Sequence, residues 1–539
     1  MSDDTTTQSA HTKSTSPRPL WEVSGHPFVN LHLVFWLILM TPSIVSLAVI
    51  WLLANTSHRG LVLALTRAES VASTVKSGAV KYNTQVLSPS LKSSRQLLDA
   101  VRKTVSEEGQ PLYTFQSGIK KLKTSLFSPH DVPGLYDAFG TEYFDNFYVR
   151  YENDKSIPRK TIDAQELILD LLKERGETGR IYLMNIDHCN SHSSFKDKVN
   201  MSNLCQEITL PTDPIDHIDD AGGEIALCIL SAINVGKITQ LDQLEDLCDL
   251  SVRGLEELID YQQYPVAAAK RSTLARRSLG VGYIGLAHYI AKNKVKYSDP
   301  QAWKLVHDLS EAFQYYLLKA SNQIAKEKGS CEYFDHTKYS DGLLPIDTYK
   351  KDVDDIVPNV LNYDWDTLRN DIKTHGLRHS TLSAQMPSES SSIVSNATNG
   401  VEPPRDYVSI KKSKKGPLKQ VVPGFPYLKS NYTLLWDMPS NEGYIKVIAV
   451  MQKFFDQGIS GNWSYNPENY PDNEVPTSVM AQDWLTTYKY GWKTSYYQNT
   501  YDAKKDTEEP IAEVAHTDLN SLLTDIMESN EEECESCSI

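Results

Sequence analysis

A long stretch without charge near the N-terminus is the strongest constraint on how this chain can fold. Residues 23–58 contain no Asp, Glu, Lys or Arg, and within them residues 31–54 read LHLVFWLILMTPSIVSLAVIWLLA. A helix of this length and apolar character is long enough to cross a bilayer, in which a single proline, Pro42, is tolerated. Trp36 and Trp51 fall where aromatic side chains favour the membrane interface. The sequence therefore predicts a transmembrane helix in residues 23–58. A buried core helix, or the product of a rearranged gene, is the alternative.

Charge divides the chain into two parts of different character. Residues 1–110 hold ten Lys or Arg against seven Asp or Glu, a net charge of +3, whereas all 539 residues together carry a formal net charge of −15. The remainder therefore carries −18, because −15 minus +3 is −18. This acidic balance argues against nucleic-acid binding through a basic face. We expect two pieces of different origin, with residues 1–22 disordered and residues 59–123 forming a helical segment and a junction.

From residue 124 onward the pattern is typical of an α/β fold. Helical segments alternate with short apolar runs, such as residues 179–185 (GRIYLMN) and 224–230 (EIALCIL), and Gly and Pro stand between them. Short strands that alternate with helices indicate an α/β architecture. Residues 124–505 are therefore predicted to form one α/β domain.

The C-terminal tail, residues 506–539, is strongly acidic. It contains eleven Asp or Glu and no Lys or Arg, and it carries Cys534 and Cys537 near its end. Like charges repel and little of such a segment can be buried, so we expect a flexible arm. The arm is either a plain acidic tail or a carrier of a thiol pair. Seven cysteines in the whole chain, an odd number, indicate reduced thiols, and their spacing predicts no metal site.

A thiol flanked by polar side chains lies in residues 202–207 (SNLCQE). If this segment is extended, alternate side chains share a face, which would bring Asn203, Cys205 and Glu207 into a row along one ligand. A structural cysteine beside surface polar residues is the alternative interpretation. A second cysteine, Cys228, lies in the apolar run 224–230, where core packing is the simpler interpretation.

Residues 386–400 (MPSESSSIVSNATNG) form a segment rich in hydroxyl and amide groups. Hydroxyls and backbone N–H groups at the start of a helix can hold a phosphate. A helix cap followed by a polar loop is the alternative. The candidate phosphate-binding residues are Pro387, Ser388, Glu389, Ser390 and Ser391.

Two adjacent tyrosines, Tyr496 and Tyr497, lie in residues 493–500 (KTSYYQNT). Adjacent aromatic residues usually belong to a core and its rim. Their special use would be a one-electron relay, because a phenol can lose an electron and a proton together.

In this order, the motifs SNLCQEI, GEIALC, PSESSSIVSNATNG and SYYQNT and a terminal cysteine pair resemble the large (alpha) subunit of class I ribonucleotide reductases. The resemblance covers roughly residues 124–539 and includes further family-like sequence, such as residues 127–137 (FSPHDVPGLYD), 344–349 (LPIDTY) and 400–405 (GVEPPR). It implies the second half of a ten-stranded α/β barrel. In this chain the half barrel would follow an unrelated helical segment that contains the predicted transmembrane helix.

The resemblance implies radical reduction of ribonucleotides to deoxyribonucleotides. Cys205 would be the transient thiyl radical that abstracts the ribose 3′ hydrogen. Glu207 would be the general base on the 3′ hydroxyl, and Asn203 would bind substrate hydroxyls. Cys228 would be one member of the reducing thiol pair. The other implied roles are substrate-phosphate binding by Pro387, Ser388, Glu389, Ser390 and Ser391, radical transfer by Tyr496 and Tyr497, and a redox shuttle by Cys534 and Cys537.

The same resemblance implies partners. A separate small subunit would carry a di-iron centre and a tyrosyl radical, and this chain would hold no cofactor of its own. Thioredoxin or glutaredoxin would reduce the tail thiols, and a ribonucleoside diphosphate would be the substrate. The catalytic part would be cytoplasmic, with contact to a membrane through residues 31–54.

Residues 1–123 do not resemble the upstream part of the family, which holds the first half of the barrel, the allosteric ATP and deoxynucleotide sites and the other reducing cysteine. We therefore predict a split large subunit, whose N-terminal half is a second chain. The alternative is an inactive, membrane-anchored fusion remnant of a reductase.

Overall fold

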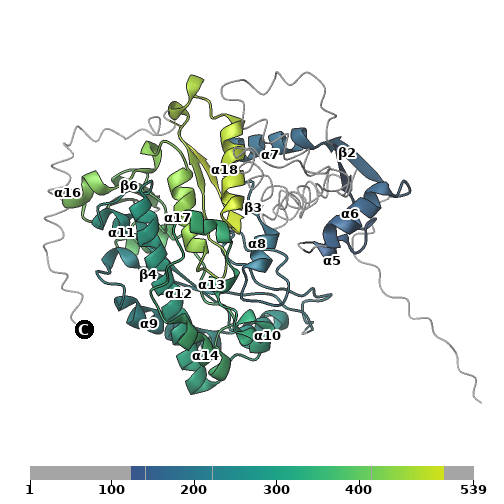
Figure 1. The fold of residues 1–539 in the computed structure, drawn as a ribbon, viewed down its shortest axis with the longest axis horizontal. Coiled ribbons are helices and arrows are strands. Elements are labelled where there is room, and N and C mark those ends of the chain that lie inside the picture. The colour runs from purple at the N-terminus through teal and green to yellow at the C-terminus, as the bar shows by residue number, and fades with distance from the viewer. Residues whose placement is uncertain (1–122, 140, 142, 221, 414–415, 503–539) are drawn as a thin grey trace, which may run out of the picture.

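The computed structural model describes residues 123–502, except residues 140, 142, 221, 414 and 415. The predicted transmembrane helix (residues 23–58) and the acidic tail with its two cysteines lie outside the described residues. Within them, no helix combines the length and the apolar character needed to cross a membrane. The described chain forms a large α/β body, beside which a smaller unit is built mainly from residues 123–163 (Figure 1).

Helices make up most of this part of the chain. The α-helices are α5 (Leu135–Ala138), α6 (Tyr143–Asn153), α7 (Ala164–Thr178), α8 (Ile186–Ser191), α9 (Gln243–Tyr261), α10 (Ala267–Arg276), α11 (Leu286–Lys292), α12 (Pro300–Lys328), α13 (Pro345–Thr348), α14 (Trp365–His375), α15 (Glu389–Val394), α16 (Phe425–Leu428), α17 (Glu442–Gln452) and α18 (Thr477–Lys489). The strands are β1 (Lys123–Phe127), β2 (Arg159–Asp163), β3 (Leu183–Met184), β4 (Ile229–Asn234), β5 (Leu279–Ile284), β6 (Val408–Ser413), β7 (Gly416–Val421), β8 (Trp463–Tyr465), β9 (Thr494–Ser495) and β10 (Gln498–Thr500).

Parallel extended segments form the centre of the large body. β4 pairs in parallel with β5, in a register that sets Ile229 opposite Leu279. On its other side β5 meets residues 381–385 through a parallel bridge between Val281 and Ser383. Residues 381–385 in turn meet residues 457–460 through a parallel bridge between Gln385 and Ile459. The chain returns by helices between these segments, which is the arrangement of an α/β barrel.

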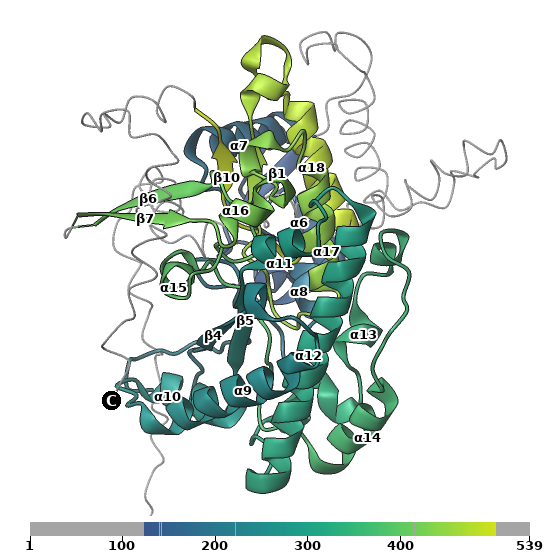
Figure 2. The same ribbon diagram turned by 90° about the vertical axis from the view of Figure 1, so that its left-hand side faces the viewer.

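The helices that connect these segments cover one side of them. α9 and α17 both pack against α12, the longest helix, and α9 also packs on β4 and β5 (Figure 2). Pro300 occupies the first turn of α12, where its missing N–H costs nothing, and Gly329 ends the helix with a φ of 87°. All six residues of β5 (LGVGYI) are buried, as expected for a strand covered on both faces.

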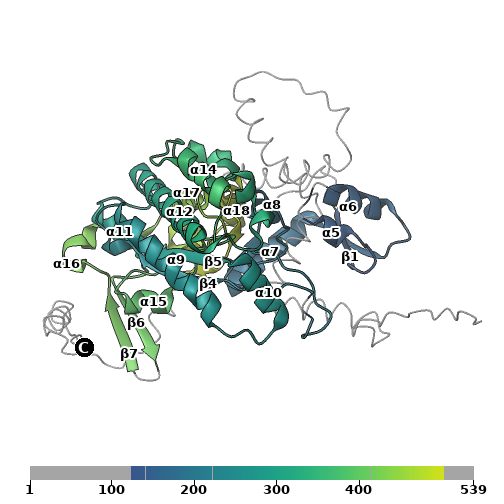
Figure 3. The same ribbon diagram turned by 90° about the horizontal axis from the view of Figure 1, so that it is seen from below.

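The smaller unit has an apolar cluster of its own. β1 and β2 form an antiparallel pair, and α5 and α6 lie beside it (Figure 3). Phe127, Phe144 and Tyr148 are at most 5% exposed and pack together with residues of α8 and of the loop that follows it. The antiparallel hairpin of β6 and β7 projects from the other side of the large body (Figure 3).

Two predicted strands are shorter than the sequence pattern indicates. In residues 179–185 only Leu183 and Met184 form a strand, which pairs with β9. The run 224–230 was expected to be one strand, but β4 begins only at Ile229, so Cys228 precedes the strand rather than lying within it. Apolar composition predicted both runs, whereas strand length depends on a neighbouring segment in register.

A buried carboxylate ties the third and fourth parallel segments together. Asp456 accepts hydrogen bonds from the backbone N–H groups of Leu382 (3.0 Å) and Ser383 (2.8 Å). It also accepts from the Ser383 hydroxyl (2.9 Å) and the Tyr339 hydroxyl (2.8 Å). All four partner groups are donors, so both oxygens of Asp456 act as acceptors in these hydrogen bonds.

We predict that Asp456→Asn destabilises the fold. The amide would turn an N–H₂ group toward one set of donors, which leaves buried groups unpaired and costs about 2–4 kcal/mol in the free energy of unfolding. Chemical denaturation of the full chain measures this. Asp366→Asn is the matched control, because Asp366 is 94% exposed, and it should change stability by less than about 0.5 kcal/mol. Equal stability of the two variants would contradict the structural role of Asp456.

Candidate active site

The segment SNLCQE folds as a turn, so Cys205 lies on a loop and the condition of an extended segment is not met. The Gln206 N–H donates to the Asn203 carbonyl (3.2 Å), which closes the turn, and Gln206 has a φ of 72°. The Asn203 side-chain oxygen accepts from the Ile208 N–H at 3.0 Å. Cys205 therefore lies at a turn, and Glu207 follows it. The geometry of alternate side chains on one extended face therefore does not apply, although the turn still keeps the three residues close together.

An extended segment, residues 457–462, lies against this turn. The Gly458 N–H donates to the Glu207 carbonyl at 2.8 Å. The Ser460 hydroxyl donates to the Cys205 carbonyl at 2.5 Å and is 3.2 Å from Oε2 of Glu207. A Cβ atom at position 458 would come within 2.6 Å of the Gln206 carbonyl oxygen, so only glycine permits this approach.

Successive residues of the same segment, from Gln457 to Asn462, contact the remaining predicted catalytic residues. The Gln457 side-chain amide reaches Sγ of Cys228 at 3.8 Å. The Gly461 carbonyl accepts from the Tyr496 N–H (2.7 Å), and Oδ1 of Asn462 accepts from the Tyr497 N–H (2.9 Å). The structure thus brings Asn203, Cys205, Glu207, Cys228, Tyr496 and Tyr497 together along one strand-like segment.

The tyrosine pair makes direct contact with the turn. The Tyr496 hydroxyl donates to Sγ of Cys205 at 3.3 Å, and the rings of Tyr496 and Tyr497 have centroids 4.1 Å apart. A third ring, that of Tyr182, lies 4.8 Å from Tyr496 and 5.4 Å from Tyr497 between centroids. Three phenols and one thiol are therefore in continuous contact.

Arg175 supports the backbone of the tyrosine pair, although nothing in the sequence marks it as a site residue. Its guanidinium is fully buried, lies 4.4 Å from the centroid of the Trp463 ring, and donates to the carbonyls of Ile181, Tyr496 (2.9 Å) and Tyr497. Burial lowers the pKa of Arg175 to about 9. A buried arginine with carbonyl partners has no signature in sequence, because two of those partners, Tyr496 and Tyr497, are more than three hundred residues away.

Burial sets the protonation of the site. It raises the pKa of the Cys205 thiol, and the hydrogen bond from Tyr496 opposes this rise. Burial also raises the pKa of Glu207, against the hydrogen bonds from Asn203 and Ser460. The pKa values of Cys228 and Tyr496 are raised for the same main reason. Neutral thiols and phenols are the forms that exchange hydrogen atoms.

The predicted phosphate-binding residues lie at the end of the third parallel segment. Ser388 is buried, and its N–H donates to Oδ1 of Asn399 at 3.2 Å. α15 begins at Glu389, and Pro387, Glu389, Ser390 and Ser391 are exposed. The segment joins the site through Gln385, whose carbonyl accepts from the Ser460 N–H at 2.9 Å. The exposed residues therefore border the site at its open end.

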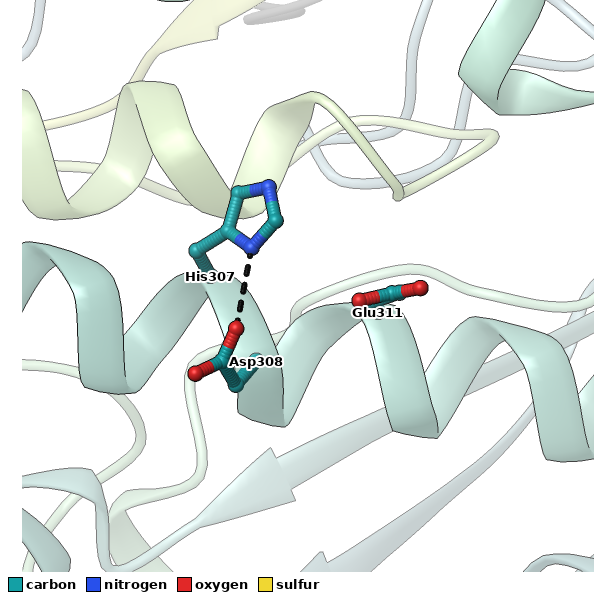
Figure 4. A group of neighbouring side chains, drawn as sticks. All are labelled: His307, Asp308 and Glu311. Atoms are coloured by element: carbon teal, nitrogen blue, oxygen red, sulfur yellow. Dashed lines mark hydrogen bonds and ion pairs between the residues drawn. The ribbon is translucent and has the colours of Figure 1, made fainter. Parts of the chain in front are cut away.

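One group among the described residues has the composition of a metal site, and it lies elsewhere. His307, Asp308 and Glu311 are neighbours on α12 (Figure 4). Nε2 of His307 is 3.3 Å from Nζ of Lys453. The oxygens of Glu311 accept from the side chain and N–H of Asn362 and from the Trp365 indole. Donors from the protein fill these positions, so the group joins α12 to its neighbours.

Comparison with known proteins defines the class. The chain belongs to the ribonucleotide reductase barrel domain family, whose sequence model matches residues 113–498. It is 57% identical over 402 residues to the ribonucleoside-diphosphate reductase subunit alpha of Haemophilus influenzae, covering 74% of this chain and 53% of that protein. It is 54% identical to the ribonucleoside-diphosphate reductase 1 subunit alpha of Escherichia coli (72% of this chain and 52% of that protein). It is 43% identical to the ribonucleoside-diphosphate reductase subunit alpha of Enterobacteria phage T4 (70% and 51%). The chain thus spans about half the length of these relatives.

We predict that Tyr496→Phe slows alkylation of Cys205. Loss of the phenol removes the donor that stabilises the thiolate, so the Cys205 pKa rises further and the thiolate fraction falls. A hydrogen bond worth about 1 kcal/mol corresponds to a roughly fivefold slower rate below the midpoint. Peptide mapping by mass spectrometry after iodoacetamide treatment measures it. Tyr283→Phe is the control, because that buried phenol contacts Ser310 and not a thiol. An unchanged rate at Cys205 would contradict the contact.

Proposed function

We propose that this chain is the catalytic C-terminal portion of a ribonucleoside-diphosphate reductase that works by thiyl-radical chemistry. The observation that carries the proposal is the 3.3 Å hydrogen bond from the Tyr496 hydroxyl to Sγ of Cys205. It joins a pair of phenol rings in mutual contact to a thiol that has a buried carboxyl group two residues away. The names of the alpha-subunit relatives support the same activity.

In the proposed reaction, oxidation reaches Tyr496 from Tyr497, and Tyr496 then takes the hydrogen atom of the Cys205 thiol. This leaves a thiyl radical and an intact phenol. The thiyl radical abstracts the 3′ hydrogen of the ribose and regains its S–H bond. Glu207 accepts the proton of the 3′ hydroxyl, and Asn203 holds Glu207 and substrate hydroxyls.

Reduction of the ribose requires two electrons, which a thiol pair supplies by closing to a disulfide. Cys228 is proposed as one member, because the Gln457 amide contacts its sulfur beside the turn of Cys205. The second member is proposed to come from the N-terminal half of the large subunit, as the family resemblance implies. Cys534 and Cys537 would re-reduce the pair by thiol exchange and would in turn be reduced by thioredoxin or glutaredoxin.

The substrate and the radical source complete the proposal. The exposed Pro387, Glu389, Ser390 and Ser391, together with Ser388, are proposed to hold the phosphates of a ribonucleoside diphosphate. A small subunit with a di-iron centre and a tyrosyl radical is proposed to supply the oxidising equivalent to Tyr497. Allosteric nucleotides would bind to the N-terminal half.

We further propose that a second chain supplies that half, and two surfaces support this. Among the described residues, β4 pairs with β5 alone, so its other edge is open. α9, which packs on β4, carries a second apolar stripe at helical spacing. Leu247, Leu250, Leu258 and Tyr261 are 37%, 71%, 48% and 86% exposed. An open strand edge beside an exposed apolar stripe is a surface that needs a partner.

Ribonucleotide reduction by the full chain with the small subunit, with and without a co-expressed N-terminal half, tests the proposed function. We predict deoxyribonucleotide only when all three are present, and none with Cys205→Ser in an otherwise intact complex, because the O–H bond of serine is too strong for a tyrosyl radical to break. Appreciable turnover by Cys205→Ser would overturn the assignment. No turnover by the folded wild-type complex would favour an inactive, membrane-anchored remnant.

We predict that Leu250→Asp weakens binding of the N-terminal half. An unpaired charge buried in the interface should raise the dissociation constant at least about tenfold. The stability of this chain alone should change by less than about 0.5 kcal/mol, since Leu250 is exposed. Glu257→Gln is the control on the same helix, because its side chain is 71% exposed and paired with Lys328. Calorimetric titration measures both, and equal affinities would contradict a docking role for the stripe.

A further inference from the structure

Ser460 occupies a position between the two predicted catalytic groups of the turn. Its side chain is 6% exposed. Its hydroxyl lies 2.5 Å from the Cys205 carbonyl oxygen and 3.2 Å from Oε2 of Glu207. One side chain thus contacts the backbone of the proposed radical thiol and the carboxyl of the proposed base.

The number of hydrogens available for the hydrogen bonds of Ser460 depends on whether Glu207 is protonated. A serine hydroxyl has one hydrogen to donate and can also accept, whereas a carbonyl oxygen only accepts. When Glu207 is ionised, the Cys205 carbonyl and the carboxylate both attract the single Ser460 hydrogen. When Glu207 is protonated, its O–H can donate to Oγ of Ser460 while Ser460 donates to Cys205. Ser460 thus keeps a contact with Glu207 in both states, and the contact is the stronger, charge-assisted one when Glu207 is ionised and draws the shared hydrogen.

The backbone around Ser460 is fixed, so its hydroxyl serves as a reference point for the turn. The Ser460 N–H donates to the Gln385 carbonyl at 2.9 Å, and two residues earlier the Gly458 N–H donates to the Glu207 carbonyl at 2.8 Å. Gly458 allows the two backbones to approach to a distance that any side chain would prevent. The turn is held at two points by one strand-like segment.

We propose that Ser460 is a positioning residue that holds Cys205 and Glu207 in register and accommodates the proton that Glu207 takes from the substrate hydroxyl. In that step the O–H bond of the substrate breaks and an O–H bond forms on Glu207, with no change of oxidation state. The inference rests on the proposed function for the identity of the proton donor. The hydrogen-bond arrangement itself belongs to the chain alone.

The groups that face Glu207 define what its titration reports. The thiol of Cys205 lies on the same turn, and the thiol of Cys228 lies before β4. The amide of Asn203 and the hydroxyl of Ser460 both donate to the carboxyl group and lower its pKa, against the larger effect of burial. Among the groups that hydrogen-bond the side-chain carboxyl of Glu207, Ser460 is the one that residues 457–462 supply.

Titration of Glu207 in the full chain tests the inference directly. Carbon-13 NMR of glutamate labelled at Cδ follows the carboxyl group, with its resonance assigned by its loss in Glu207→Gln. Loss of a hydrogen bond to the ionised carboxyl in Ser460→Ala should shift the midpoint upward by about one pH unit. Ser460→Thr, which keeps the hydroxyl, should return the midpoint to within a few tenths of the wild-type value.

A matched variant separates this effect from the loss of a core hydroxyl. Ser310, on α12, is another buried serine. Its hydroxyl contacts the hydroxyl of Tyr283 on β5, away from the turn. Ser310→Ala should leave the Glu207 midpoint unchanged. An unchanged midpoint in folded Ser460→Ala, or an equal shift in Ser310→Ala, overturns the inference.

Activity of the assembled enzyme provides the second measurement. If Glu207 acts ionised, Ser460→Ala should shift the acidic limb of the pH–rate profile upward by the same amount as the NMR midpoint, and Ser460→Thr should restore it. A midpoint shift in the chain without any turnover by the wild-type complex would count against the proposed function while the role of Ser460 stands. Turnover with an unshifted acidic limb would overturn the role of Ser460 while the function stands.

Discussion

The hydrogen bonds between residues 457–462 and the turn of Cys205 are the interaction on which the site depends. Gly458 and Ser460 fix Glu207 and Cys205, and the next two residues fix the backbone of the tyrosine pair. The segment is itself held in parallel to residues 381–385, which lead into the proposed phosphate-binding residues. A displacement of this one segment would therefore move thiol, base and relay together. Close approach of two backbones, which Gly458 permits, is what makes the coupling rigid.

A low-dielectric site explains why these groups share a direction of pKa change. Burial raises the pKa of Cys205, Cys228, Glu207 and Tyr496 and so favours their uncharged forms. A thiol that keeps its proton can give up a hydrogen atom, whereas a thiolate can only give up an electron. Arg175 brings a positive charge near the relay and donates hydrogen bonds to the backbone carbonyls of Tyr496 and Tyr497.

The outer surfaces of the described body are less complete than its centre. The open edge of β4 and the apolar stripe of α9 would be unfavourable in water, since neither backbone groups nor leucine side chains are matched there. The relatives of this chain are about twice as long as the region they share with it. Both observations agree with an active site that closes only when further barrel strands join β4.

Sequence by itself determined the class of fold and singled out the candidate reactive residues. The alternation of apolar runs and helices predicted α/β architecture, and the order of short motifs singled out Cys205, Glu207, Cys228 and the tyrosine pair. The predicted transmembrane helix and tail thiols lie outside the described residues and stay predictions. Local patterns carry this information because reactive groups and apolar runs are composed of neighbours in the chain.

Only the tertiary structure decided how those residues meet. Residues 203–207 form a turn and not an extended segment, because their backbone pairs with Gly458, some 250 residues away, instead of with a neighbouring strand. The sequence does not mark Ser460 or Arg175 as site residues, because a serine in a polar run and an arginine in a helix both have ordinary neighbours in the chain. Their roles arise from carbonyl groups that lie hundreds of residues apart along the chain, and such distances are set by packing rather than by any local pattern.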